Sequence, residues 1–261
     1  MLAIKRHQMI LEYLNLHKAA TTKQLSELTN ASLATLRRDL NYLAQQGLLK
    51  KTHGGAQACP EESVPEISSV SSLQYDPDLS NKDAIAKKAA ELVHSGDIIF
   101  IGAGMTCNLL CRYINDYSPE RLTVVTTNVT AVMELAQNPN ISTLLLGGNI
   151  HTGTNHIETL DEYTIQSLEQ LYFHKAFITV DGIDLTCGYS IINRAQLPLY
   201  HHLLQNSREL YLLANNGKFG RRTFTHFCDL SDISRVITNP SVPGNYLEYY
   251  REHGVDVIVT D

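Results

Sequence analysis

The chain has 261 residues, of which 43% are hydrophobic, and a formal net charge of −6. This length predicts two domains, and the apolar content is large enough to give each a buried core. No run of eighteen apolar residues is free of charges, and charges interrupt the apolar pattern at the N-terminus, so neither a membrane span nor a signal peptide is predicted. We therefore expect a cytoplasmic protein without a membrane partner.

The net charge is distributed unevenly along the chain. Residues 1–58 carry eight Lys and Arg against three Asp and Glu, whereas the remaining residues carry thirteen against twenty-four. A basic N-terminal segment followed by an acidic body is typical of a nucleic-acid-binding domain attached to a second domain.

Cysteines and histidines give no indication of a metal or a disulfide scaffold. The five cysteines have no CxxC spacing, and Cys107 and Cys111, one helical turn apart, are expected to be packing residues. The histidines are expected at the surface because no two make a sound ligand pair with a nearby carboxylate; they are His151, His156, His174, His201 and His202. No metal and no cofactor are predicted.

The N-terminal segment predicts three helices. Residues 4–17 have helical apolar spacing, and a short helix over Lys23–Leu28 can be capped by Thr21 or Thr22. After a turn at Asn30-Ala31, Ser32 can cap a third helix. Three helices with a short turn before the last describe a helix-turn-helix.

The third helix is amphipathic. One apolar stripe, predicted to face a core, consists of Leu33, Leu36, Leu40 and Leu43. Thr35, Arg38 and Tyr42 fall on another face, with Arg37 between the two. The helix thus presents cations and hydrogen-bonding groups beside its anchoring leucines.

A β-hairpin is expected after this helix. Gly47 can end the helix, and Lys50 to His53 then run into the turn signal Gly54-Gly55, which places cations on a wing. Each cation taken singly could equally be a solvated surface group. Taken together, the cations lie on one helix and one wing of a basic segment, and this arrangement favours DNA binding.

Two stretches carry a resemblance to a known family: RHQMILEYL, and TTKQLSELTNASLATLRRDLNYLAQQGLLKKTHGGA. Over residues 5–56 they resemble the winged helix of the DeoR family of bacterial transcriptional regulators. The resemblance implies that the third helix enters the major groove and that the wing contacts phosphates. The DNA contacts expected are Thr22, Ser32, Thr35, Arg37, Arg38, Tyr42, Lys50, Lys51 and His53.

Three domain segments are predicted: a winged helix-turn-helix domain over 1–57, a linker over 58–79 that contains Pro60, Pro65 and Pro77, and an α/β domain over 80–261. In the third segment, Ser80 to Asp83 resembles a capping box that opens a helix over 81–94. Strands are then expected at 97–101, 122–126, 142–146, 176–180, 209–214, 235–238 and 255–259. Helices are expected at 105–114, 129–137, 159–170, 196–206 and 244–252. Apolar strands alternating with helices predict an open, mostly parallel sheet.

Polar loops directly follow several of these strands. Gly102 to Thr106 opens a helix and offers backbone amides to an anion, and Lys218 could neutralise one. A lone GxG is weak evidence, but carboxyl ends of parallel strands meet at one edge, where a ligand is expected. The loops also resemble the family's ribose-5-phosphate-isomerase-like sensor domain, over residues 80–239. Effector contacts are expected at Gly102, Gly104, Met105, Thr106, Thr127, Asn128, Gly147, Gly148, Asp181 and Lys218.

The chain departs from the family pattern in three places. Met105 stands where the family usually has Thr, and Asn215 where it usually has Asp. A glutamate expected near 194–196, the general base of the related isomerases, is replaced by Arg194-Ala195-Gln196. This loss argues against isomerase activity.

The sequence therefore predicts a non-enzymatic, DNA-binding transcriptional regulator, favoured as a repressor of a carbohydrate operon. Its partners are double-stranded operator DNA, a phosphorylated sugar effector and further copies of itself in a dimer or tetramer. Two alternatives stay open: a sugar-phosphate isomerase-like enzyme with an appended DNA-binding module, and an architectural DNA binder whose α/β domain only oligomerises.

Overall fold

The computed structural model divides the chain into two compact units, residues 1–68 and 69–261. It describes residues 6, 9, 10, 13, 14, 17, 19–29, 31–45, 49–52, 54–58, 78–117, 119–152 and 156–260, without the side chains of 27, 34, 42, 45 and 58. The predicted linker lies mostly outside the described residues, as does the predicted helix end at Gly47. Among the described residues, no helix is both long and apolar enough to cross a membrane.

The N-terminal unit contains helices and a small antiparallel sheet. The described residues between 6 and 17 are helical, and α2 (Thr22–Thr29) and α3 (Leu33–Gln45) follow. The sheet has the order β1-β3-β2, with β1 (Ala19–Thr21), β2 (Leu49–Thr52) and β3 (Gly55–Ala58). The hairpin β2–β3 is the predicted wing, whereas β1 was not predicted.

One apolar core holds this unit together. Its residues include Ile10, Leu14, Leu25, Leu36, Leu40, Leu43 and Leu49. The predicted stripe is wrong at its first residue, because Leu33 is 51% exposed. Leu33 is the first residue of α3, nearly one turn before Leu36, so its side chain extends past the edge of the core.

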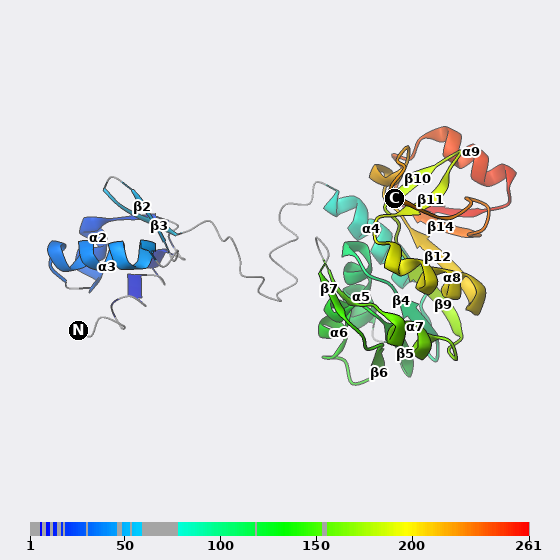
Figure 1. Ribbon diagram of the computed structural model, residues 1–261, viewed down its shortest axis with the longest axis horizontal. Helices are drawn as coiled ribbons and strands as arrows, with labels where there is room; N and C mark the ends of the chain where they lie inside the picture. The colour runs from blue at the N-terminus through cyan, green and yellow to red at the C-terminus, as the bar shows by residue number, and fades with distance from the viewer. Residues whose placement is uncertain are drawn as a thin grey trace. The chain divides into compact units, whose positions relative to one another are not determined.

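The larger unit is built on a seven-stranded sheet with the order β15-β14-β12-β9-β4-β5-β6 (Figure 1). All of its pairings are parallel. Its strands are β4 (Ile98–Ile101), β5 (Leu122–Thr126), β6 (Ile141–Leu145), β9 (Phe173–Ile178), β12 (Ser207–Leu213), β14 (Arg235–Thr238) and β15 (Asp256–Val259). The open parallel α/β fold predicted from the sequence is confirmed.

Helices cover both faces of this sheet, because side chains of each strand alternate between the faces. Ile99, Ile101 and Phe177 pack in one core with α4 (Leu79–Ala90), α5 (Met105–Tyr117) and α6 (Val129–Leu135). Phe100, Ile178 and their neighbours pack in a second core with α7 (Glu162–Leu168), α8 (Leu197–Asn206) and α9 (Gly244–Glu252). Apolar runs such as that of β4 are therefore buried from two sides.

The order of the strands creates a switch point at the centre of the sheet. From β4 the chain proceeds outward through β5 and β6 on one side, and then through β9, β12, β14 and β15 on the other. With right-handed crossovers, this reversal places the helices on opposite faces and opens a crevice at the carboxyl ends of β4 and β9.

The structure corrects several local predictions. Helix α4 begins at Leu79 with Asp78 at its N-cap and no side-chain cap hydrogen bond, so the predicted capping box from Ser80 is wrong. The predicted helix over 159–170 is shortened to α7, because Thr159 ends β8 (Ile157–Thr159), which pairs with β7 (Ile150–Thr152). A small antiparallel sheet was also missed: β10 (Gly182–Asp184), β11 (Gly188–Ile191) and β13 (Thr225–Cys228).

An ion pair connects the start of β4 to β9. Lys175 Nζ donates to Asp97 Oδ2 at 2.5 Å, and the His94 amide donates to the same oxygen at 2.9 Å. Burial raises the pKa of Asp97, but the Lys175 hydrogen bond, the His94 amide and the neighbouring charges outweigh it and hold this pKa below its ordinary value. The ionised carboxylate is therefore the form that the fold stabilises.

This pKa shift predicts a loss of stability in acid. A carboxyl group with a lowered folded-state pKa stabilises the fold above the unfolded pKa, about 4, and loses that effect as the pH falls through the folded value. Asp97→Asn should lower the free energy of unfolding at pH 7, and the difference from the native protein should shrink below about pH 4. Urea unfolding followed by circular dichroism measures this, with the exposed Asp116→Asn as control; a difference independent of pH would contradict it.

Candidate functional site

Helix α3 presents two unengaged cations at the surface of the N-terminal unit. Arg37 and Arg38 are exposed and make no hydrogen bond or ion pair with any residue that the structure describes. Ser32 caps the helix, since its Oγ accepts from the Thr35 amide at 3.2 Å and lies 2.9 Å from Thr35 Oγ1. The predicted cap is confirmed, and the two arginines stand free for an anionic partner.

A buried ion pair connects the buried side of α3 to the first helix. Asp39 is 6% exposed, and Arg6 donates to its two carboxylate oxygens from Nε at 2.5 Å and from a terminal nitrogen at 3.0 Å. Sequence reasoning missed this role, although Asp39 falls on the same side of the helix as Leu36, Leu40 and Leu43. The bidentate geometry fixes α3 against the first helix.

The wing is attached to both helices. Lys51 Nζ donates to Asn41 Oδ1 of α3 at 2.6 Å, and the Thr22 amide and hydroxyl both donate to the Gly54 carbonyl at 2.8 Å. Lys50 and Lys51 are exposed on β2. Thr22, predicted as a DNA contact, thus holds the wing turn to α2. His53 and the Tyr42 side chain lie outside the described residues.

A cavity of about 510 Å³ lies in the larger unit at the carboxyl ends of β4, β9 and β12. Ala103 to Thr106 follow β4, Thr179 and Asp181 follow β9, and Asn215 and Lys218 follow β12. The cavity thus occupies the switch point, where open α/β sheets bind their ligands.

Helix α5 and two lysines form an anion-attracting part of the cavity wall. Gly104, at φ +116°, precedes the helix, and its carbonyl accepts from the Asn108 amide at 3.0 Å, so the first amides of α5 have no partner within the helix. Lys82 and Lys218 add positive charge. Burial lowers the pKa of Lys218, an effect that Asp181 at 3.7 Å opposes. A phosphate fits these groups.

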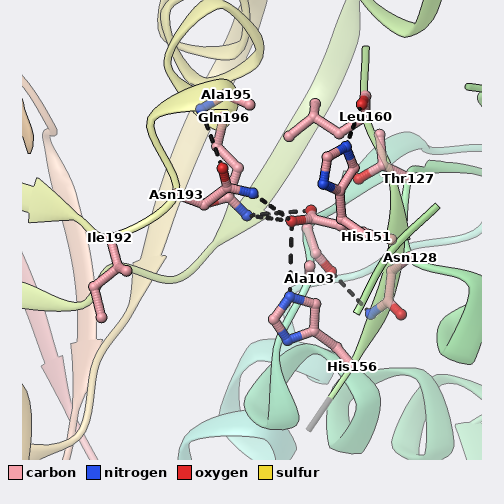
Figure 2. A network of polar contacts seen from close by, with 12 residues as sticks. Ala103, Thr127, Asn128, His151, His156, Leu160, Ile192, Asn193, Ala195 and Gln196 are labelled. Atoms are coloured by element: carbon pink, nitrogen blue, oxygen red, sulfur yellow. Dashed lines mark hydrogen bonds and ion pairs between the residues drawn. The ribbon is translucent and has the colours of Figure 1, made fainter. Parts of the chain in front are cut away.

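A buried carboxylate forms another part of the wall. Glu158, on β8, is 2% exposed and accepts from Gln196 Nε2 at 2.9 and 3.1 Å and from Asn193 Nδ2 at 3.4 Å. His156 Nε2 lies 3.7 Å from the same carboxylate. Figure 2 shows Asn193, Gln196 and His156 converging on one point, with His151 turned to the Leu160 carbonyl.

The structure brings half of the predicted effector contacts together. The residues that line the cavity are Gly104, Met105, Thr106, Asp181 and Lys218. The predicted residues that do not line it are Gly102, Thr127, Asn128, Gly147 and Gly148. The role of these five residues as effector contacts therefore stays a prediction.

Two of these residues, Asn128 and Gly148, have structural roles within the fold. Thr127 and Asn128 are fully buried, and Asn128 caps α6 by accepting from the Ala131 amide while donating to the Gly102 carbonyl at 3.2 Å. Gly148 has φ +146°, and an added Cβ would lie 2.3 Å from Thr164 Oγ1. Backbone shape and close packing therefore favour glycine at this position.

Several lining residues were missed by sequence reasoning. Glu158 was assigned to the loop before an expected helix, and His151 and His156 were expected to be ordinary surface groups. Lys82 lies on α4, distant in sequence from the other loops. No local signal marked these residues, although Gln196 stood where the family's glutamate was expected. Among the described residues, no group of three His, Cys, Asp or Glu could hold a metal ion.

The missing glutamate at 194–196 does not leave the cavity without a carboxylate, because Glu158 reaches it from β8 and is hydrogen-bonded to Gln196. The loss of the glutamate at 194–196 therefore does not by itself exclude isomerase chemistry.

A winged helix joined to an α/β domain with a ligand-sized cavity defines the class of DNA-binding transcriptional regulators. Two family models agree: the DeoR-like helix-turn-helix domain matches residues 6–62, and the DeoR C-terminal sensor domain matches residues 78–240. The chain belongs to the DeoR family. It is a DNA-binding regulator and not a sugar-phosphate isomerase, as the sequence predicted.

Relatives that match over most of both chains are named as regulators. An uncharacterized HTH-type transcriptional regulator, YulB of Bacillus subtilis, is 32% identical, and the match covers 92% of this chain and 90% of YulB. The lactose phosphotransferase system repressor of Staphylococcus epidermidis is 33% identical, and the match covers 88% of this chain and 89% of the repressor. Ribose 5-phosphate isomerase A of Methanocaldococcus jannaschii matches 54% of this chain and 55% of its own at 19% identity and a TM-score of 0.38, too remote to carry an argument.

The position of Gly148 predicts a stability effect. Gly148→Ala should lower the free energy of unfolding by about 1–3 kcal/mol, because it forces a left-handed alanine against Thr164. Gly147→Ala is the matched control, since an added Cβ there meets no atom within 4 Å. Chemical denaturation of both variants measures the difference, and equal stability would contradict this account of Gly148.

The exposure of Arg38 predicts an effect on DNA binding. Arg38→Ala should weaken binding to a selected genomic fragment by about 1–3 kcal/mol and relax sequence preference, if the guanidinium pairs with a base edge. Fluorescence anisotropy measures this, with the exposed Arg208→Ala of the larger unit as control. Unchanged affinity would remove Arg38 from the DNA interface.

Proposed function

We propose that this regulator represses a carbohydrate-metabolism operon, and that a phosphorylated sugar bound in the cavity modulates the affinity of the regulator for operator DNA. The similarity to the lactose phosphotransferase system repressor, which covers most of both chains, supports repression of such an operon. In this proposal residues 1–57 bind DNA, and residues 80–261 sense the effector and hold two or four copies of the chain together.

The anion-attracting wall of the cavity is the observation that carries the proposal. The amides at the start of α5, Lys82 and Lys218 converge on one space of about 510 Å³. A helix N-terminus combined with ammonium groups favours a phosphate over a neutral ligand. The remaining wall is rich in hydrogen-bonding side chains, which suits the hydroxyl groups of a sugar.

The proposed DNA interface follows from α3 and the wing. Arg37 and Arg38 would read bases in the major groove, with Ser32 and Thr35 beside them, while Lys50 and Lys51 would contact phosphates. Two such domains related by two-fold symmetry would match half-sites about one helical turn, or a multiple of it, apart.

Regulation requires the effector and the operator to favour different states of the protein. If the sugar phosphate binds better to the state that holds DNA poorly, each ligand weakens the binding of the other by the same factor. An architectural DNA binder lacks this coupling. Metabolite-dependent release of DNA therefore distinguishes the two.

Lys218→Ala tests the role of the cavity. The variant should bind the selected genomic fragment with unchanged affinity but need about 10- to 100-fold more sugar phosphate to release it, because a charge-assisted contact with the phosphate is lost. Anisotropy titrations of the protein–DNA complex with pentose and hexose monophosphates measure both quantities.

Lys87→Ala is the matched control, since Lys87 is exposed on α4 outside the cavity lining. Release of DNA from the Lys218 variant at the normal sugar phosphate concentration would show that the effector binds elsewhere. Insensitivity of the native complex to every sugar phosphate would argue against the sensor function itself.

A further inference from the structure

The buried carboxylate in the cavity is a feature that phosphate binding does not explain. Glu158 is 2% exposed, yet the groups around its carboxylate are two amides, from Gln196 and Asn193, and the imidazole of His156. Lys218, a cation of the same cavity, pairs with Asp181 instead. A negative charge is thus held at the cavity wall mostly by neutral donors (Figure 2).

Its surroundings hold this carboxylate in one orientation. Asn193 Oδ1 accepts from the Ala195 amide at 3.1 Å while its amide nitrogen donates to Glu158, so the side chain is fixed at both ends. Gln196 is 8% exposed and bridges the two carboxylate oxygens. Among the described residues, Glu158 Oε2 accepts only from Gln196, which leaves it capacity for a further donor.

A second buried group points to the same ligand. Asn215 is 3% exposed and lines the cavity, and its Nδ2 has no hydrogen-bond partner in the described structure. A buried amide without a partner is costly, so a ligand oxygen at this position would be favourable. The cavity therefore offers an acceptor at Glu158 and a donor at Asn215, in addition to its cations.

From this arrangement we propose that Glu158 determines the chemical class of the effector. It accepts a hydrogen bond from a hydroxyl or amino group of a sugar that carries a single phosphate. It excludes bisphosphates and phosphorylated sugar acids, because a second anion would be placed beside a buried carboxylate with little water to screen the repulsion. The inference rests on the proposed sensor function and specifies its ligand.

Calorimetric titration of the full-length native protein tests this selectivity. The probes are pentose and hexose monophosphates, the bisphosphates and phosphorylated aldonic acids with the same carbon skeletons, and inorganic phosphate. We expect a monophosphate to bind best, and its bisphosphate and acid counterparts to bind about 10- to 100-fold more weakly.

Glu158→Gln tests whether the carboxylate causes the discrimination. Removing the charge while keeping the shape should weaken the best monophosphate about tenfold and reduce the gap to the bisphosphate and the acid. Glu169→Gln, at an exposed glutamate of the same unit, is the matched control. Because the selectivity of the native protein is measured first, the proposal stays testable even if the Glu158 variant does not fold.

The outcomes separate this inference from the proposed function. Monophosphate binding that depends on Lys218 but is unaffected by Glu158→Gln would overturn the role of Glu158 and leave the sensor function in place. A bisphosphate or sugar-acid phosphate as the best ligand would do the same. Failure of every phosphorylated probe to bind would overturn both.

Discussion

The reversal of strand order between β4 and β9 is the constraint on which the larger unit depends. Because β4 is followed outward by β5 and β6, and β9 is followed outward by β12, β14 and β15, the connections leave the sheet on opposite sides. The carboxyl ends of the central strands are therefore not covered by a crossover helix. Loops that are far apart in sequence meet there, and together with α4 and the hairpin β7–β8 they supply the polar groups of the cavity.

Buried strands and their adjoining loops were the part of the fold that the sequence could predict. Strands Leu122–Thr126 and Arg235–Thr238 and the helix Gly244–Glu252 have the predicted bounds, because apolar runs and helical periodicity are local signals. The hairpin β7–β8 carries no such signal, since the residues of β7 are all exposed. Its position depends on contacts with distant loops, which only the folded chain reveals.

The residues of the cavity likewise divide into those that local sequence signals could predict and those that depend on distant contacts. Gly104, Thr106, Asp181 and Lys218 directly follow predicted strands, so the order of elements was enough to find them. Glu158 could not be found in this way, because its partner Gln196 is 38 residues further along the chain. Asn128 and Gly148 also follow strands, but the structure shows Asn128 capping a helix and Gly148 allowing close packing, and neither lines the cavity.

The attachments of the wing have a mechanical consequence for the N-terminal unit. Lys51 holds β2 to α3 through Asn41, and Thr22 holds the turn at Gly54 to α2, so hydrogen bonds connect the hairpin to both helices. In the proposed DNA complex, these contacts within the domain would set the spacing between a phosphate bound by the wing and the bases under α3. A poorly matched operator copy would then have to be accommodated by the DNA rather than by a shift of β2 relative to α3.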